Sequence, residues 1–259
     1  MSTIALITDF GTEDWFAGEL KGTILSINPL AVPIDLTHTI QRGYIREAAF
    51  ILLASYRSFP ENTVFMSAVD YGSTRTRVIC ARTASHIFLA PDNGLLSWVL
   101  RRETAADVRE VNIDEYLLPS GCSTFPARDL LAPLAAGLSD WLEFENCGEE
   151  TNEYVTLHWP EPSLGKGTAE AAVIYIDRFG NAITSISPRE VVFACGDAPE
   201  CILENDRRVP LGNHYSDVPL WKAVAYPGSA GLMEIGVNGG NAAEILELDV
   251  GSNVCFTGH

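Results

Sequence analysis

The segments IALIT (residues 4–8), WFAGELKGTILSI (15–27) and VPIDLT (32–37) decide the class of the fold. The first and third are short apolar runs typical of buried strands, whereas the middle one has the apolar spacing of an amphipathic helix. YIREAAFILLASY (44–56) and VFMSAV (64–69) continue the alternation with a second helix and a third strand. This β-α-β-α-β order predicts an α/β fold, in which helices cover a parallel sheet and ligands bind beyond the carboxyl ends of the strands.

The C-terminal part of the chain has a different pattern. Residues 143–168 are acidic and rich in Pro and Gly, as is typical of a linker between domains. The segments AAVIYID, AITSIS, EVVFACG and GLMEIGV that follow are interpreted as short strands of a small β-rich domain such as a barrel, with a helix expected only near residues 241–246. We therefore expect an N-terminal α/β domain over 1–145, a linker over 146–168 and a β-rich C-terminal domain over 169–259.

The composition is that of a globular protein, and the charge disfavours several kinds of partner. Lys and Arg number 17 against 34 acids, a formal net charge of -17, so nucleic acids and anionic membranes are not expected partners. No apolar run reaches the roughly 18 residues that cross a bilayer, and no signal peptide is recognisable, so we expect a cytoplasmic protein. The cysteines and histidines show no metal-ligand spacing, and neither a metal nor a cofactor is expected.

Acidic residues stand at the ends of the predicted parallel strands. Asp9, Asp35 and Asp70 are therefore expected near the ligand cleft. The carboxylate of Asp9 is suited to bind the two hydroxyls of a ribose, although a single acid at such a place more often caps a loop or helix. Asp70 and Arg77 flank one Gly-containing turn, where they can form either a charge-assisted pair at a site or a structural ion pair.

A second candidate site lies in the segment YIDRFGNAITSIS of the C-terminal domain. Asp177, Phe179 and Asn181 fall within five residues of one another. Phe179 offers a face for stacking, Asn181 an amide that can pair with an adenine edge, and Asp177 a carboxylate for an ammonium group. A tight turn at FGN accounts for the Gly and Asn without any ligand, so both interpretations remain open.

Taken together, the segments of this chain resemble the S-adenosyl-L-methionine (SAM) hydroxide adenosyltransferases, or SAM hydrolases, which are related to fluorinase and chlorinase. The matching stretches include ITDFG, KGTILSINP, DLTH, IREAAF, APDNGLLS, IDRFGN and GSAGLMEIGVNGGNAA. The resemblance implies a Rossmann-like α/β domain, a C-terminal β-barrel, and a homotrimer whose sites lie between the N-domain of one subunit and the C-domain of its neighbour. It also implies hydrolysis of SAM to adenosine and L-methionine, by attack of water at the ribose C5′, without a cofactor.

The resemblance further implies roles for individual residues. Asp70 and Arg77 would be catalytic and lie beside C5′, while Asp9 would bind the ribose hydroxyls. Asn181 and the backbone at Val237 would hold adenine, with Phe179 packed near it. The other substrate-binding residues that the resemblance implies are Asp177, Ser229 and Glu234 at the methionine end, together with Asp14, Tyr44 and Phe125.

Two positions depart from the family pattern. Gly43 stands where the relatives carry an aromatic residue over the ribose, a place that the neighbouring Tyr44 can take. The relatives carry a histidine in T-F-H-G-R-D, whereas this chain has Pro126 in the segment TFPARD, and proline offers no donor from its side chain or its backbone. Three functions therefore remain open: hydrolysis with Asp70 and Arg77 alone, a sensor that binds SAM or adenosine without turnover, and halide transfer. Halide transfer is disfavoured, because the carboxylate of Asp70 would repel an anion, and the halogenases have an uncharged residue there.

Overall fold

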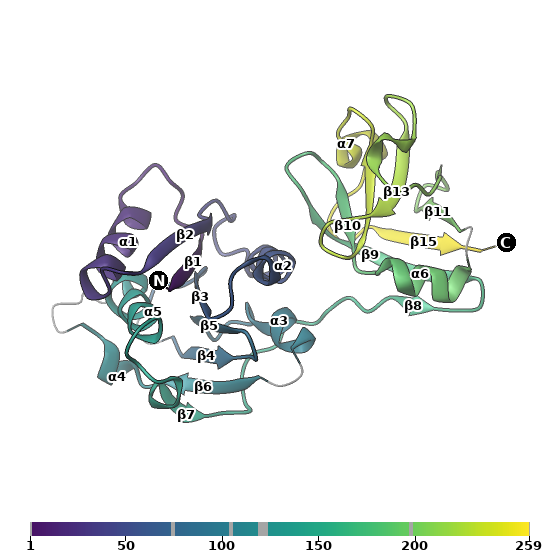
Figure 1. Cartoon of the computed structure of the whole chain (residues 1–259). Helices are drawn as coiled ribbons and strands as arrows, with labels where there is room; N and C mark the ends of the chain where they lie inside the picture. Colours follow the sequence, from purple (N-terminus) through teal and green to yellow (C-terminus); the bar gives the residue numbers. More distant parts are fainter. Residues whose placement is uncertain (1, 74–75, 104–105, 119–123, 197–198, 259) are drawn as a thin grey trace. The chain divides into compact units, whose positions relative to one another are not determined.

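The polypeptide forms two units, Met1–His158 and Trp159–His259, and each has its own sheet and its own hydrophobic core (Figure 1). The computed structural model describes residues 2–73, 76–103, 106–118, 124–196 and 199–258. Within these ranges, no helix is both long enough and apolar enough to span a membrane.

A seven-stranded sheet organises the first unit, in the order β2-β1-β3-β5-β4-β6-β7. The strands are β1 Thr3–Thr8, β2 Val32–Thr37, β3 Thr63–Ala68, β4 Val78–Arg82, β5 His86–Pro91, β6 Asp107–Val111 and β7 Gly148–Glu150. β2, β1, β3 and β5 are parallel neighbours, which confirms the predicted α/β fold, whereas β4, β6 and β7 continue the sheet with antiparallel pairing. The carboxyl ends of β1 and β3 therefore lie next to each other.

Helices of the first unit pack on the sheet because its central strands, β1, β3 and β5, are buried on both faces. They are α1 Phe16–Ile27, α2 Ile45–Ser55, α3 Ser97–Arg102, α4 Ile113–Tyr116 and α5 Ala132–Leu138, with a π-helical turn, η2, over Ala127–Leu131 and short 3-10 turns η1 Tyr56–Ser58 and η3 Phe144–Asn146. α1 packs against α5, and α2 packs against α3. The predicted helices over 15–27 and 44–56 are confirmed as α1 and α2.

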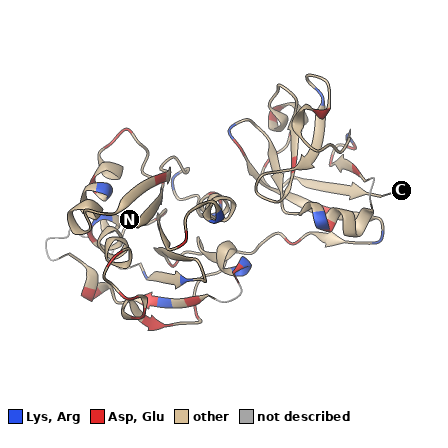
Figure 2. Cartoon of the chain, viewed as in Figure 1, with Lys and Arg blue, Asp and Glu red and all other residues tan. Residues whose placement is uncertain are grey.

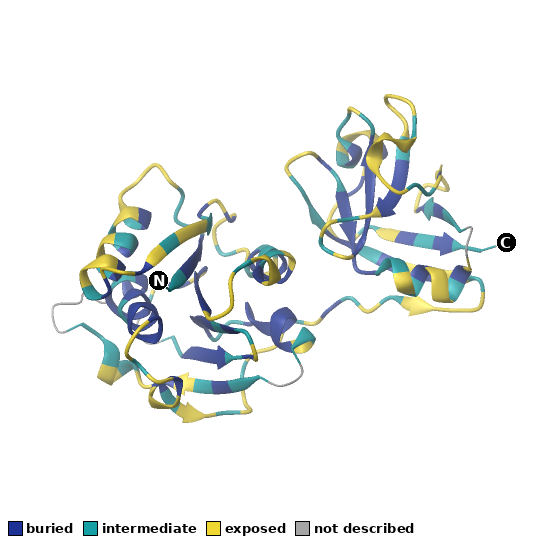
Figure 3. Ribbon diagram, viewed as in Figure 1, coloured by how far each residue is buried: buried dark blue, intermediate teal, exposed yellow. Residues whose placement is uncertain are grey.

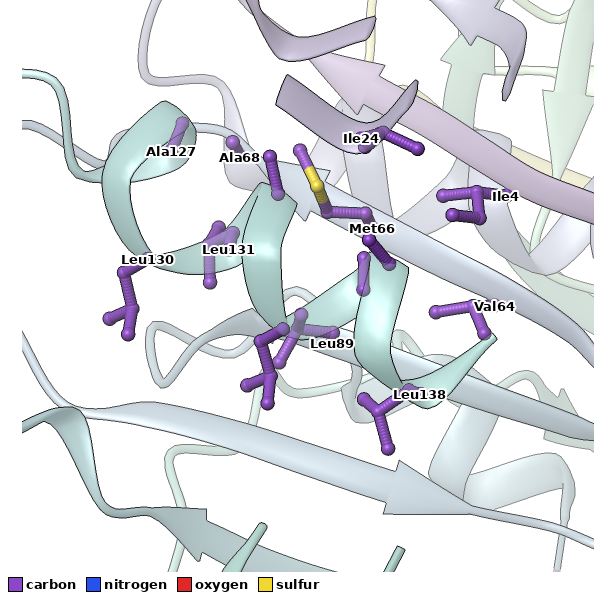
Figure 4. Close-up of a cluster of buried hydrophobic side chains, with 14 of the residues drawn as sticks. Ile4, Ile24, Val64, Met66, Ala68, Leu89, Ala127, Leu130, Leu131 and Leu138 are labelled. Carbon is purple, nitrogen blue, oxygen red and sulfur yellow. The ribbon is translucent and has the colours of Figure 1, made fainter. Parts of the chain in front are cut away.

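The core of the first unit shows the alternation expected of strands. Met66 and Leu89 face the cluster that includes Leu131 of η2 (Figure 4). The preceding residues, Phe65 and Phe88, point to the opposite face, where their rings stack at 5.2 Å between centroids. All five side chains are fully shielded from solvent, and the central strands are buried along most of their length (Figure 3).

An eight-stranded antiparallel sheet forms the second unit, in the order β12-β11-β15-β9-β10-β14-β13, with β8 paired to β9. The strands are β8 Ser163–Leu164, β9 Thr168–Ile176, β10 Ala182–Thr184, β11 Glu200–Leu203, β12 Arg208–Val209, β13 Ala223–Pro227, β14 Met233–Val237 and β15 Asn253–Thr257. A bridge between Leu211 and Ala225 brings the two ends of the sheet together, so that it nearly closes into the predicted barrel.

Helical segments of the second unit are short, and one of them overturns a prediction. They are α6 Pro188–Cys195, α7 Ala242–Leu246 and the 3-10 turn η4 Tyr215–Asp217. The predicted helix near 241–246 is confirmed, but the strand predicted at EVVFACG is wrong, because this segment forms most of α6. The side chain of Ser187 accepts from the backbone of Glu190, and the side chain of Glu190 accepts in return; this capping box and Pro188 in the first turn favour a helix over the β-branched valines.

The segment expected to be a linker contributes strands to both units. β7 pairs with β6 in the first sheet, and β8 pairs with β9 in the second. Between these strands, residues 151–162 form no helix or strand. The first unit therefore extends beyond residue 145, as far as His158.

Candidate functional site

Three loops of the first unit meet at the carboxylate of Asp9, directly after β1. Its Oδ2 accepts the backbone N–H of Gly43 at 2.9 Å and that of Asp70 at 3.2 Å. Gly43 precedes α2 and Asp70 follows β3, so the contact joins the ends of two neighbouring parallel strands to the loop that enters α2. The sequence placed Asp9 and Asp70 at one cleft, and the structure brings them together.

The backbone of Asp70 is unusual, and its side chain is exposed. Its φ is 53°, in the left-handed region, where Asp and Asn are better tolerated than most residues other than Gly. A Cβ added to Gly43 would lie 3.7 Å from Oδ1 of Asp70, so the Asp70 carboxylate faces the Gly43 backbone. Among the described residues, the Asp70 side chain has no hydrogen bond or ion pair, which leaves its carboxylate open to a ligand.

Arg77 has other partners in this structure. Its Nε lies 3.0 Å from Oδ2 of Asp92, its Nη1 lies 3.3 Å from Oε2 of Glu110, and its Nη2 donates to the carbonyl of Glu153. Glu110 belongs to the acidic residues that line β6 and β7 (Figure 2). The ion pairs of Arg77 are thus with Asp92 and Glu110, and neither form of the expected pair between Arg77 and Asp70 occurs among the described residues. A catalytic role of Arg77 stays a prediction.

The remaining predicted residues of the first unit differ in exposure. Asp14 and Tyr44 are exposed, and the Tyr44 side chain stands at the start of α2. Phe125 is buried, with its ring 5.6 Å from that of Phe10 and the Arg128 guanidinium 5.4 Å from its centroid. Residue 123, which precedes the TFPARD segment, lies outside the described residues.

Pro126 directly precedes the π-helical turn η2. Its φ of -66° and ψ of -22° are close to helical values, so proline fits this position without distorting the helix start. The next side chains belong to a charged group: Nε of Arg128 lies 2.6 Å from Oδ1 of Asp129, and Nη1 lies 3.3 Å from Oε2 of Glu19. Pro126 itself brings no donor to this end of the sheet.

A turn organised by Asp177 carries the predicted residues of the second unit. Oδ1 of Asp177 accepts the N–H groups of Phe179 at 2.9 Å and of Asn181 at 2.8 Å, and its Oδ2 accepts the Asn181 amide at 2.9 Å. Gly180 completes the turn at φ 84°. The turn interpretation is therefore confirmed, and it presents Phe179 to solvent with 77% of its surface exposed.

The same turn lines a cavity of about 640 Å³. Phe179, Asn181 and Val237, all singled out in the sequence, share its wall with Tyr215, Trp221, Gly239, Gly240 and Asn241. Trp221 was not among the residues singled out in the sequence, where the only available signal is an aromatic residue two positions after Pro219. Its φ of 65° and its 67% exposure set it apart from a core residue. The cavity combines aromatic faces with two amides, those of Asn181 and Asn241, a lining suited to a flat heterocycle.

Beside the turn, Glu234 is a buried carboxyl. It lies on β14 opposite Tyr226 of β13 and Ile183 of β10. Burial raises its pKa above the ordinary value, the charge of Asp177 raises it further, and hydrogen bonds from the Tyr226 hydroxyl and the Ser229 backbone only partly oppose this. A Cβ at Gly228 would lie 2.0 Å from Oε1 of Glu234, so any larger residue there would displace the Glu234 side chain. Glu234, Asp177 and Tyr226 together form a site suited to bind an ammonium group.

Across the described ranges, no three His, Cys, Asp or Glu side chains are grouped so as to hold a metal ion. The predicted residues thus form two sets. The set around Asp9 belongs to the first unit, and the set around Asp177 belongs to the second.

A partly parallel α/β sheet followed by a nearly closed antiparallel barrel defines the class of this protein, a two-unit α/β and β-barrel protein. Its residues 4–148 match the family model of the SAM hydroxide adenosyltransferase N-terminal domain, and residues 171–255 match that of the C-terminal domain. The chain belongs to the SAM hydroxide adenosyltransferase family, which confirms the resemblance found in the sequence.

Individual relatives agree with this assignment. The chain is 34% identical to the (R)-S-adenosyl-L-methionine hydrolase of Thermus thermophilus, over 98% of this chain and 99% of the relative. It is 27% identical to the fluorinase of Nocardia brasiliensis, over 97% and 95% of the two chains. The solved structure of an uncharacterized conserved protein from Thermotoga maritima superposes with a TM-score of 0.90 at 29% identity, covering 99% of this chain and 100% of that one.

Proposed function

We propose that this protein hydrolyses SAM to adenosine and L-methionine by attack of water at the ribose C5′. The observation that carries the proposal is the meeting of Asp9 and Asp70 at the carboxyl ends of β1 and β3. Oδ2 of Asp9 is held by two backbone N–H groups, and Oδ1 has no partner among the described residues, which leaves it for a ribose hydroxyl. The exposed carboxylate of Asp70 is then adjacent to the sugar.

The chemistry needs little more than orientation. The sulfonium of SAM makes methionine a good leaving group, so the protein has to align one water with the C5′–S bond and exclude other solvent. The water oxygen bonds to C5′, the C5′–S electron pair stays on sulfur as a thioether, and the water proton passes to Asp70 or to solvent. A carboxylate that accepts this proton contributes about 10²- to 10⁴-fold to the rate.

The second unit would hold the two ends of the substrate. Asn181 and the Val237 backbone would bind adenine in the cavity beside Phe179, and Asp177, Ser229 and Glu234 would bind the methionine ammonium and carboxylate ends. In the first unit, Asp14, Tyr44 and Phe125 would complete the ribose side, and Arg77 would assist Asp70. A homotrimer with sites shared between subunits, and a location in the cytoplasm, are part of the same proposal.

A second candidate function, binding of SAM or adenosine without turnover, is favoured by one observation. Pro126 occupies the position of the family histidine at the start of η2 and offers no proton donor. The two functions are separated by incubating the protein with SAM, with and without chloride, and following adenosine, methionine and 5′-chloroadenosine by chromatography. Adenosine formed without chloride supports hydrolysis, binding without product supports the sensor, and 5′-chloroadenosine would refute both.

Variants test the roles of the residues. Asp70→Asn should lower turnover by about 10²- to 10⁴-fold with SAM binding largely retained, because asparagine keeps the left-handed backbone but cannot take the proton. Turnover that survives this change contradicts the role of Asp70. Shared sites are tested by co-expressing Asp70→Asn with Asn181→Ala: sites between subunits should recover about a quarter of the activity, and sites within one subunit should recover none.

A further inference from the structure

His38, which follows β2 in the DLTH segment, is a buried residue at the centre of a chain of polar contacts that ends at the partly exposed side chains of Asp35 and Lys21. It is 3% exposed. Its Nδ1 lies 2.8 Å from Oγ1 of Thr8, its Nε2 lies 3.0 Å from Oδ1 of Asp35, and Oδ2 of Asp35 accepts from Nζ of Lys21 at 2.6 Å. Burial would raise the pKa of Asp35, but the contacts with Lys21 and His38 prevail and hold it below its ordinary value. The imidazole therefore connects the end of β1 to a carboxylate of β2.

The residue types Thr, His and Asp invite comparison with a nucleophilic triad, but the burial rules this out. Thr8 is fully buried, so no substrate reaches its hydroxyl. The Nε2 of His38 is close to Asp35 without the alignment of a regular hydrogen bond, which is a loose contact for a proton relay. What the chain of contacts can do is fix the positions of the backbone segments that it joins.

Those backbone segments flank Asp9. Thr8 immediately precedes Asp9, and its Oγ1 also accepts the N–H of Phe10 at 3.4 Å. The carbonyl of His38 accepts the N–H of Gly11 at 2.8 Å. His38 therefore contacts both sides of the Asp9 backbone, with its ring on the strand side and its carbonyl on the loop side.

The same loop returns to the carboxylate itself. Residues 38–43 run from His38 to Gly43, whose N–H donates to Oδ2 of Asp9 at 2.9 Å. The loop is thus attached to the end of β1 at both of its ends, and Asp9 lies between the two attachments. A shift of His38 would move the Gly43 N–H away from Asp9 and leave its Oδ2 held by the Asp70 N–H alone, at 3.2 Å.

We propose that His38 is a positioning residue that orients the Asp9 carboxylate toward the ribose hydroxyls, through its bond to Thr8 and the loop that ends at Gly43. This inference rests on the proposed function, because it takes Asp9 to be the ribose-binding group. Since a hydrogen bond to a charged group is worth about 10-fold or more in affinity, the wild type should bind adenosine at least about 10-fold more tightly than 2′,3′-dideoxyadenosine.

Two substitutions separate the two ring contacts. His38→Asn places an amide near the position of Nδ1 and can keep the bond to Thr8, whereas His38→Gln places it near Nε2 and can keep only the contact with Asp35. We expect the His38→Gln protein to bind adenosine about as weakly as it binds 2′,3′-dideoxyadenosine. We expect the His38→Asn protein to retain most of the wild-type preference for adenosine. His86→Gln is the matched control, because His86 is buried in the same unit with its Nε2 3.4 Å from the Phe59 carbonyl, and it should change stability without changing the preference.

Calorimetric titration of each full-length variant with adenosine and with 2′,3′-dideoxyadenosine gives the preference as a ratio of Kd values. The inference would be overturned if His38→Asn and His38→Gln lost the preference for adenosine equally. It would also be overturned if His38→Gln left the ratio of Kd values unchanged, or if His86→Gln lowered the preference. So would a wild type without the preference. If the wild type shows the expected pattern but forms no adenosine from SAM, the hydrolase proposal fails, whereas the positioning role of His38 stands.

Discussion

Replacing Gly180 by alanine should disturb both the turn organised by Asp177 and the start of α7. Gly180 has φ 84°, and a Cβ added there would lie 1.9 Å from Oδ1 of Asn241 and 2.2 Å from its Cγ. Oδ1 of Asn241 accepts the N–H of Glu244 at 3.2 Å and thereby caps α7. Gly180→Ala must therefore hold an alanine in the left-handed region and also displace the capping side chain.

The two effects can be given magnitudes. A left-handed backbone costs an L-residue about 1–2 kcal/mol, and loss of an N-cap costs about 1 kcal/mol. We expect Gly180→Ala to lower the free energy of unfolding by about 2–3 kcal/mol. Gly167→Ala is the matched control, because Gly167 has φ 79° but no atom within 4 Å of an added Cβ. This variant should lower the free energy of unfolding only by the cost of a left-handed backbone.

Urea unfolding of the full-length chain measures these costs, through the transition of the second unit. In an Asn241→Ala background the cap is already absent, so Gly180→Ala should then cost no more than Gly167→Ala. The reasoning is refuted if the two glycine variants lose the same stability in the wild-type background. It is also refuted if the extra cost at Gly180 persists after Asn241 has been removed.

Two further predictions concern substitutions of single buried side chains. Leu89→Ala should lower the free energy of unfolding by about 2–5 kcal/mol, because Leu89 is fully buried in the core of the first unit; thermal or urea unfolding checks this, and a loss below about 1 kcal/mol would contradict it. Because the folded-state pKa of Glu234 is raised above 4.5, its stabilising contribution is present below that pH and is lost as the pH rises through the raised value. Glu234→Gln should remove this part of the pH dependence in unfolding curves measured across acidic to neutral pH, and an unchanged dependence would contradict the assignment.

Much of the fold could be predicted from local pattern. α1, α2 and the strands β1 and β3 follow the apolar periodicity, because each element buries one face or both against its neighbours. α6 could not be predicted in this way, since its β-branched valines favour a strand and only the capping box at Ser187 indicates a helix. The antiparallel pairing of β4, β6 and β7 is a long-range property that no single segment encodes.

The candidate site could also be predicted only in part. Asp9 and Asp70 come together because parallel strands end at one edge, which is a rule of topology. The contacts of Arg77 with Asp92 and Glu110 depend on the packing of separate strands, and the sequence spacing of Arg77 from Asp70 does not reveal them. No sequence pattern singles out His38, and its contacts on both sides of Asp9 become apparent only in three dimensions.

The left-handed backbone of Asp70 also restricts how this protein can evolve. At φ 53°, asparagine and glycine are the uncharged residues tolerated best, and β-branched residues are strained. Codons for both asparagine and glycine are a single base change away from those for aspartate, whereas the threonine codons are not. A lineage that lost the negative charge at this position would therefore pass most readily through asparagine or glycine, and any later gain of a β-branched residue would first require the loop after β3 to change its conformation.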